Sequence, residues 1–256
     1  MEFIDTHTHL YLEDFSSDID EIIERAIASG VNKLFLPAVD SSTTRDLVSL
    51  CKKYPQNCFP MVGLHPTSVK ADFQDELRNV EDELKKGFYI AVGEIGIDLY
   101  WDKTYFKEQS EAFLRQLSLA KQYHLPVVIH TRDSFNETYD LINSFTNESV
   151  KGIFHCFSGN VDDAFKIIEK GFKIGVGGVV TFKNSLLSQV VKEIELEHIV
   201  LETDAPYLTP TPYRGKRNES SYIPIIARKI AEIKDVSLEE VATITTRNAY
   251  EVFGNL

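Results

Sequence analysis

The fold is decided by residues 127–155, which read VVIHTRDSFNETYDLINSFTNESVKGIFH. Short apolar runs, 127–129 and 152–154, stand near its two ends, and each is followed directly by a histidine. Between them, residues 135–144 form an amphipathic stretch of helical spacing. A strand, a helix and a second strand in this order predict two parallel strands joined by a crossover helix.

The same alternation of short apolar runs and amphipathic stretches continues to both ends of the chain. The runs lack a strict polar–apolar alternation, as expected of strands that are covered on both faces. Eight predicted strands, each followed by a helix, indicate an α/β protein of the (β/α)8 TIM-barrel type with an extra C-terminal helix. The predicted strands are 3–5, 33–36, 59–62, 89–94, 127–130, 152–155, 173–176 and 199–202, and the predicted helices are 17–29, 43–53, 75–85, 106–123, 135–144, 161–170, 185–193, 223–232 and 238–253.

Length and charge narrow the class of protein further. The chain has 256 residues, close to the roughly 250 of a typical TIM barrel, so we expect a single domain over residues 1–256. Its formal net charge of −12 argues against broad wrapping of nucleic acid, because phosphate contacts need Lys and Arg. Bound divalent cations would still supply positive charge at a local site.

Cysteine content and apolar runs bear on the compartment. Cys51, Cys58 and Cys156 form no CxxC motif and are too few for a disulfide framework. The first residues lack the features of a signal peptide, and no apolar run approaches the roughly 18 residues of a spanning helix. We therefore expect a cytoplasmic protein with reduced thiols, no membrane association and no obligate protein partner. Cys156 is expected to face the core.

Histidines and acidic residues follow the predicted strands at their carboxyl ends. In a parallel barrel these ends converge on one face, where active sites form. His7 and His9, two residues apart on extended chain, point the same way and can bind one ion, while Glu94 at the end of the fourth predicted strand can bridge two. Such a cluster of buried charge needs a counter-ion. The candidate metal ligands are His7, His9, Glu94, His130, His155 and Asp204.

The ligand types limit the metal and the chemistry. Imidazole and carboxylate together suit zinc, manganese or iron, and a carboxylate-rich variant admits magnesium. Two divalent cations can activate a water and stabilise both oxygens of a displacement at phosphorus. Singly, each residue has a simpler explanation: Glu94 pairs with Arg132, Asp204 caps a turn, or His65 is an ordinary loop residue. The combination of residues on one rim carries the prediction.

Weaker features surround this cluster. The loop Arg214-Gly215-Lys216-Arg217 is the best local anion-binding patch of an otherwise acidic chain, and the alternative is a solvated loop. Tyr100 and Trp101 either stack a base or pack against the rim. The glycine-rich stretch 175–178 either admits a phosphate to the backbone or forms a tight turn.

Six ordered motifs resemble the TatD family of metal-dependent deoxyribonucleases. They are residues 5–10 (DTHTHL), 63–66 (GLHP), 93–98 (GEIGID), 126–133 (PVVIHTRD), 155–159 (HCFSG) and 201–208 (LETDAPYL). The resemblance implies a barrel of the metallo-dependent hydrolase superfamily and the six metal ligands named above, with Glu94 shared by two ions. It also implies that Asp204 acts as general base, and that His65 and Arg132 assist substrate binding.

The resemblance implies hydrolysis of phosphodiester bonds, often as a 3′–5′ exonuclease on single-stranded or frayed DNA. We expect two divalent cations (Mg, Mn or Zn), with Glu94 and Asp204 in the catalytic role and Arg214 and Arg217 holding phosphates. A D-aminoacyl-tRNA deacylase with tRNA as substrate, or another ester or amide hydrolase, is the alternative, because the same ligands serve both. A metal-binding scaffold without turnover is the third possibility. Leu99 and Ser220 depart from the family pattern and touch only the expected substrate rim.

Overall fold

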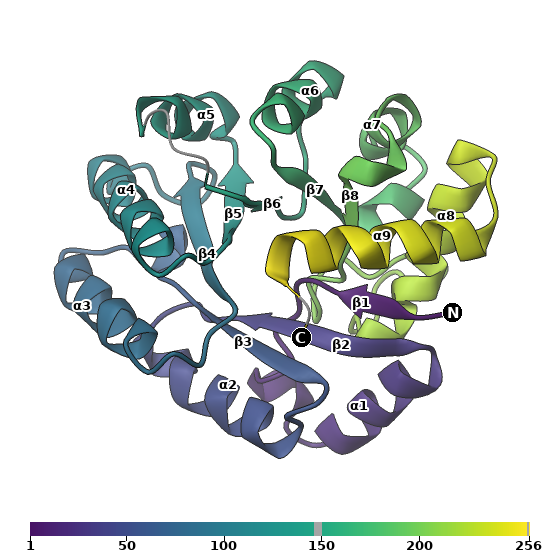
Figure 1. Ribbon diagram of the computed structural model, residues 1–256, viewed down its shortest axis with the longest axis horizontal. Coiled ribbons are helices and arrows are strands. Elements are labelled where there is room, and N and C mark those ends of the chain that lie inside the picture. The colour runs from purple at the N-terminus through teal and green to yellow at the C-terminus, as the bar shows by residue number, and fades with distance from the viewer. Residues whose placement is uncertain (146–149, 255) are drawn as a thin grey trace.

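The computed structural model describes residues 1–145, 150–254 and 256, which form a barrel of parallel strands surrounded by helices (Figure 1). The eight strands lie side by side in chain order, as in a TIM-type barrel. The predicted fold class is therefore confirmed. The strands are β1 Phe3–Asp5, β2 Val31–Pro37, β3 Cys58–Val62, β4 Ala91–Asp98, β5 Val127–Arg132, β6 Gly152–Phe154, β7 Lys173–Val176 and β8 Ile199–Leu201.

At the carboxyl ends of β1 and β8 and just beyond them, hydrogen bonds join the two segments that close the barrel. The Thr6 amide donates to the Leu201 carbonyl at 3.0 Å, and the His9 amide donates to the Ala205 carbonyl at 2.8 Å. The Asp204 amide donates in return to the His7 carbonyl at 2.9 Å. Two segments almost 200 residues apart in the chain are thus fixed against each other, and both carry candidate metal ligands.

The helices lie outside the strands, and their ends follow local sequence signals. Asp40 and Asn160 cap α2 and α6 with their side chains, and Ser237 caps α9. Gly30 and Gly171 follow α1 and α6 at φ values of +84° and +85°, which glycine adopts without steric cost. The helices are α1 Ile19–Ala28, α2 Ser41–Lys53, α3 Phe73–Leu84, α4 Phe106–Gln122, α5 Phe135–Ser144, α6 Val161–Glu169, α7 Leu187–Glu193, α8 Ile223–Lys234 and α9 Leu238–Phe253, with short 3-10 turns η1 Glu13–Phe15, η2 Pro66–Ser68, η3 Gly178–Thr181, η4 Leu196–His198 and η5 Ser220–Tyr222.

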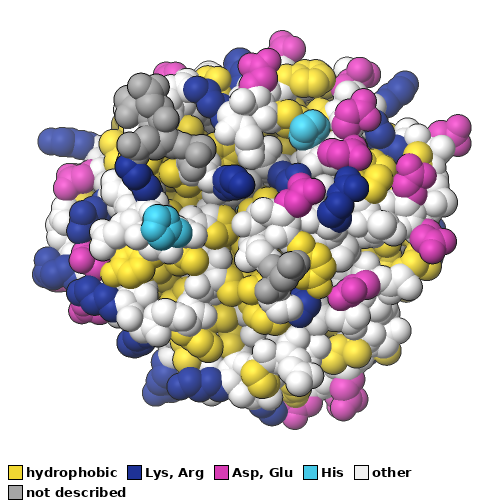
Figure 2. Space-filling view, viewed as in Figure 1, with side chains coloured by type: hydrophobic (Ala, Val, Ile, Leu, Met, Phe, Trp, Pro, Cys, Tyr) yellow, Lys and Arg dark blue, Asp and Glu magenta, His cyan; other side chains and the backbone are white. Residues whose placement is uncertain are grey.

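Helix α9 lies across one end of the barrel (Figure 1). Its buried Ala249 and Phe253 pack against an apolar layer inside the strands, to which seven strands give one residue each. The face that α9 covers shows acidic and basic side chains interspersed, and the histidine side chains visible there lie apart (Figure 2). This end is closed by packing, which leaves the opposite, carboxyl end for chemistry. The layer consists of Ile4, Phe35, Met61, Ala91, Val128, Ile153 and Val200.

Two residues beyond this apolar layer, most side chains on the inward face of the strands are polar or absent. Successive side chains of a strand alternate between its two faces, so residues i and i+2 share one face. Val128 is followed on that face by His130, Ile153 by His155, and Val200 by Glu202, whereas Met61 and Ala91 are followed by Gly63 and Gly93. The strands thus place imidazoles and a carboxylate directly above the apolar layer, and the glycines leave space among them.

Two expectations need correction. Glu94 lies in the middle of β4 rather than at its end, because the pairing of β4 with β5 shifts register between Val92 and Ile95 and then continues to Asp98. Cys156 lies on a turn after β6, half-buried and with φ of +45°, and not in a strand facing the core. Among the described residues, no helix is long and apolar enough to cross a membrane.

Candidate metal centre

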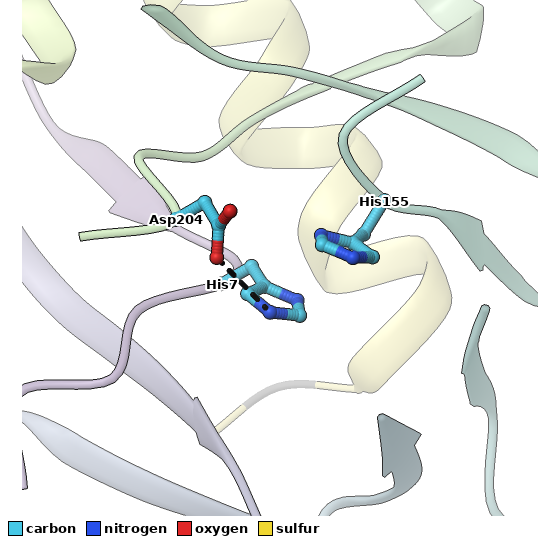
Figure 3. Close-up of side chains that lie close together, drawn as sticks. All are labelled: His7, His155 and Asp204. Carbon is cyan, nitrogen blue, oxygen red and sulfur yellow. Dashed lines mark ion pairs between the residues drawn. The ribbon is translucent and has the colours of Figure 1, made fainter. Parts of the chain in front are cut away.

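The first group of candidate ligands comes from the segments that follow β1 and β8. His7 Nε2 and His9 Nε2 lie 3.2 Å apart, as the i, i+2 spacing predicts. Asp204 Oδ1 lies 3.8 Å from His7 Nε2 and 3.4 Å from His9 Nε2. The His7 and His155 rings stack with centroids 3.8 Å apart, and Asp204 points toward His7 (Figure 3). The rings of both His7 and His155 are buried.

Glu94 joins this group to a second one. Its Oε2 lies 3.2 Å from His7 Nε2 and 3.7 Å from His9 Nε2. Its Oε1 faces the other way and lies 2.8 Å from His130 Nδ1, 2.6 Å from His155 Nε2 and 3.2 Å from His65 Nε2. One buried carboxylate therefore offers one oxygen to each of two sets of imidazoles.

The spacing of these donor atoms suits divalent metal ions. Ligands about 2.0 to 2.2 Å from one ion in a tetrahedral array lie about 3.3 to 3.6 Å from one another. The five close distances among the candidate donor atoms run from 3.2 to 3.8 Å, and these atoms are His7 Nε2, His9 Nε2, Glu94 Oε2 and Asp204 Oδ1. Nδ1 of His7 and of His155 has no hydrogen-bond partner within the described chain. Three ligand-competent groups share members here: His7 with His155 and Asp204, His7 with His9 and Glu94, and His65 with Glu94 and His130.

Charges within the cluster shift the acidities of its members. Burial, helped by neighbouring His155, lowers the pKa of His7 to about 4. Burial also opposes the charged form of His155, but the Glu94 carboxylate outweighs it and raises the pKa of His155 to about 9. The pKa of Glu94 is held well below its usual range despite burial, because His155, His65 and His7 surround it. The carboxylate is thus ionised and available as a ligand.

Two neighbours orient the imidazoles through their second nitrogens. Asp98 Oδ2 lies 2.9 Å from His130 Nε2, which leaves His130 Nδ1 to face Glu94. The Tyr11 hydroxyl lies 3.0 Å from His9 Nδ1 and donates to the Pro37 carbonyl, which leaves His9 Nε2 to face His7. Such partners fix the tautomer and ring orientation of metal-binding histidines. Neither Asp98 nor Tyr11 was assigned this role from the sequence.

A third carboxylate, Glu202, lies fully buried beneath the cluster. Its Oε1 accepts a short hydrogen bond of 2.5 Å from the Cys156 amide and lies 3.8 Å from His155 Nδ1. Burial raises the pKa of Glu202 to about 8. A Cβ at Gly175 would lie 2.3 Å from Glu202 Oε2, so this glycine makes room for the Glu202 side chain. The i+2 spacing of Glu202 from the buried Val200 is the sequence signal that could have identified it.

The glycine-rich stretch after β7 is filled by protein. Besides Glu202 at Gly175, the Leu208 carbonyl occupies the space beside Gly178, where a Cβ would lie only 2.1 Å away. Close packing thus explains these glycines without a phosphate. Asp204 combines both of its proposed roles: its carbonyl accepts the turn hydrogen bond from the Tyr207 amide at 2.8 Å, while its carboxylate faces the histidines.

The arginines predicted to bind substrate lie in three different settings. The Arg132 guanidinium lies over the Tyr100 ring at 3.9 Å and near Trp101 at 5.2 Å, and no ion pair with Glu94 appears within the described chain. Tyr100 and Trp101 are 53% and 68% exposed. This cation–aromatic cluster lies on the rim and leaves aromatic surface open to solvent.

Arg217 and Arg214, three residues apart, differ in their partners. Arg217 donates to both carboxylate oxygens of Asp18 and to the Asp14 carbonyl, and it lies over Phe15. It therefore ties the late loop to the segment before α1. Arg214 is exposed and lies over the Phe182 ring at 3.8 Å. Of the two, only Arg214 has a guanidinium without an acidic partner among the residues that the structure describes.

Comparison with known proteins agrees with this geometry. The family described as TatD related DNase matches residues 4–254. The chain belongs to this family. Curated relatives of this TatD-family protein include the uncharacterized metal-dependent hydrolase YabD of Bacillus subtilis, 38% identical over 97% of this chain and 98% of the relative. Another is the uncharacterized metal-dependent hydrolase YjjV of Escherichia coli, 31% identical over 98% and 97%.

Solved structures extend the likeness to three dimensions. The TatD homologue YjjV from Escherichia coli K12 superposes with a TM-score of 0.93 at 30% identity and covers 99% of this chain and 98% of its own. A hydrolase of the TatD family from Entamoeba histolytica superposes with a TM-score of 0.85 at 25% identity over 99% and 98%. This TatD-family chain is therefore a metal-dependent hydrolase with His, Glu and Asp clusters suited to metal binding.

Proposed function

We propose that this protein is a deoxyribonuclease that hydrolyses phosphodiester bonds at a centre of two divalent cations. One observation carries the proposal: Glu94 offers Oε2 to His7 and His9, and Oε1 to His65, His130 and His155. A carboxylate shared in this way is the arrangement that a two-cation site needs. Such sites serve in-line displacement at phosphorus in phosphatases and nucleases.

The protein's own groups have separable tasks in this reaction. Bound cations would lower the pKa of a water and stabilise the oxygens that enter and leave at phosphorus. Asp204 holds its Oδ1 toward His7 and His9, and its side chain keeps 16% exposure. Within the described chain no hydrogen bond reaches its Oδ2. Asp204 is thus placed to accept a proton from a water that enters beside the ligands.

The rim around the cluster supports a nucleic-acid substrate. Arg132 lies over Tyr100, and both Tyr100 and Trp101 are largely exposed. Exposed aromatic rings stack nucleobases, and arginine both binds phosphate and stacks on rings. The family name supports DNA as the polymer, and the expected action is removal of nucleotides from the 3′ end of single-stranded or frayed DNA.

The test uses metal-stripped protein to which Mg²⁺, Mn²⁺ or Zn²⁺ is added in turn. The substrates are single-stranded DNA labelled at its 5′ end and a D-aminoacyl-tRNA. We expect metal-dependent shortening of the DNA that keeps the label on a descending ladder. His130→Ala and Asp204→Ala are expected to abolish it, whereas His198→Gln, outside the cluster in η4, is the matched control.

Other outcomes of this test are equally informative. Release of the amino acid with the DNA intact would replace the nuclease by a deacylase at the same centre. Immediate release of a labelled mononucleotide would reverse the polarity of cleavage. Activity of His130→Ala at the level of His198→Gln would contradict the site itself.

A further inference from the structure

A hollow of about 430 Å³ lies between the loops that follow β7 and β8. Phe182, Lys183, Asn184 and Ser185 line it from one loop, and Thr211 and Arg214 line it from the other. Two of these residues carry positive charge and none of the lining residues is acidic. Val179 and the Phe182 ring give the hollow an apolar part, and its formal charge is wholly positive on a protein whose net charge is −12.

The two cations of this hollow have no acidic partner among the described residues. Lys183 and Arg214 are both exposed, and Arg214 is supported by the Phe182 ring beneath it at 3.8 Å. A guanidinium held against a ring keeps its edge N–H groups free to donate. Arg217, in the same loop, differs because its guanidinium already donates to both carboxylate oxygens of Asp18. The charges in the hollow are therefore available to an anion from solution.

The hollow lies on the same end of the barrel as the metal centre. Its two loops follow β7 and β8 at their carboxyl ends. Thr211 lies only seven positions after Asp204, a span of at most about 25 Å when fully extended. Between them, the Tyr207 ring is 54% exposed and lies 6.5 Å from the His9 ring. A strand of nucleic acid that leaves the metal centre along this loop passes an exposed aromatic ring before it reaches the hollow.

We propose that this hollow is an anion subsite that binds a backbone phosphate of the DNA strand, away from the bond being cleaved. Lys183 and Arg214 supply the charge, while the Asn184 and Ser185 side chains supply neutral hydrogen-bonding groups. The inference rests on the proposed function and deepens it. It makes the preferred substrate an oligonucleotide that reaches across the rim, rather than a dinucleotide that fills only the metal centre.

The test measures binding without turnover. Metal-loaded protein is titrated into a fluorescent single-stranded oligonucleotide with phosphorothioate linkages, which resist hydrolysis, at several salt concentrations. Each phosphate neutralised on a single strand contributes a slope of about −0.7 to the plot of log affinity against log salt. We expect the Lys183→Ala/Arg214→Ala variant to bind more weakly and to lose about 0.7 of the slope for each phosphate released. The Lys192→Ala/Arg228→Ala variant removes the same charges from α7 and α8 and should keep the wild-type slope.

A second measurement changes the oligonucleotide and compares its binding to wild type and to the Lys183→Ala/Arg214→Ala variant. Methylphosphonate, which is uncharged, replaces one linkage at a time along the oligonucleotide. We expect one internal position whose neutralisation weakens binding to wild type but has no further effect on Lys183→Ala/Arg214→Ala. That position is the phosphate in the hollow.

The outcomes separate this subsite from the proposed function. Equal affinity and equal slope for wild type and Lys183→Ala/Arg214→Ala would overturn the subsite and leave the nuclease proposal standing. If every methylphosphonate position weakened both proteins alike, the hollow would hold no phosphate. Failure of wild type to bind the oligonucleotide at all would overturn the DNA substrate and the subsite together.

Discussion

Asp98→Asn changes one atom and tests how the second ligand group is held in place. Asp98 Oδ2 contacts His130 Nε2 at 2.9 Å, and its Oδ1 accepts from the Tyr100 and Trp101 amides at 3.0 and 3.2 Å. In the Asn variant the single oxygen keeps the two backbone amides, so the amide NH2 faces His130. An NH2 group donates to Nε2 and drives the imidazole proton onto Nδ1. The nitrogen that faces Glu94 would then carry a proton and lose its lone pair for a metal.

The size of the effect follows from this change of tautomer. Loss of a carboxylate behind a metal-binding histidine costs about 10- to 100-fold in metal affinity or activity, which is about 1.4 to 2.7 kcal/mol. We expect the ion held by His130 and Glu94 Oε1 to lose affinity by this factor. The fold should survive, because the substituted side chain retains an acceptor oxygen for both backbone amides.

The assay is a metal titration against a competing chelator, with thermal unfolding as the check on folding. Asp102→Asn is the matched control, because Asp102 is exposed and its carboxylate accepts hydrogen bonds from Thr104 in a local turn. The reasoning is refuted if Asp98→Asn binds metal as tightly as Asp102→Asn while both remain folded.

Three further substitutions test separate parts of the structure. Gly175→Ala places a Cβ 2.3 Å from Glu202 Oε2 and should displace this carboxylate, whose Oε1 lies 3.8 Å from His155 Nδ1. We expect the displacement to disturb His155 and to weaken metal binding by about 10-fold, the lower end of the range for supporting carboxylates. Gly177→Ala, whose Cβ would have its nearest neighbour at 3.5 Å, should bind like wild type. Equal metal affinities of the two variants would contradict a role of Glu202 in positioning His155. Phe253→Ala opens a cavity in the apolar layer beneath α9 and should lower the free energy of unfolding in urea by about 3 kcal/mol. The control Phe88→Ala, at a side chain that is 41% exposed, should change it little. A similar loss of stability in both variants would place α9 outside the core. Arg217→Ala removes the two-point ion pair with Asp18 and the contact with the Phe15 ring, both partly exposed. It should lower the free energy of unfolding by about 1 to 2 kcal/mol. A rise in KM for DNA without loss of stability would instead support the predicted contact of Arg217 with phosphate.

Local pattern was sufficient to predict the barrel, because each strand is a short apolar run between amphipathic stretches. It also predicted that the candidate ligands would lie close together, because His130 and His155 directly follow apolar runs and parallel strand ends must meet on one face. Those predictions needed only spacing along the chain. The grouping of the ligands was predicted in part: His7 and His9 lie together as the i, i+2 spacing requires.

Contacts between residues that are far apart in the sequence could not be predicted from local sequence pattern. Arg217 binds Asp18, 199 residues away in sequence, and Asp5 binds Thr203 across the β1–β8 closure, 198 residues away. Glu94 was placed at a strand end because the predicted strand stopped at residue 94, yet β4 continues to Asp98 through its shifted register. The same continuation carries Asp98 to His130, so one error in a strand boundary concealed a residue that orients a candidate ligand.

The most direct test of the two-cation centre is the number of metal ions bound per chain. Metal-stripped protein is dialysed to equilibrium against Mn²⁺ or Zn²⁺, and the bound metal is measured by mass spectrometry against protein concentration. The arrangement of Glu94 between two groups of imidazoles predicts two ions per chain for wild type and fewer than two for Glu94→Gln. A wild-type chain that binds one ion or none, or a Glu94→Gln variant that retains two, would contradict the account.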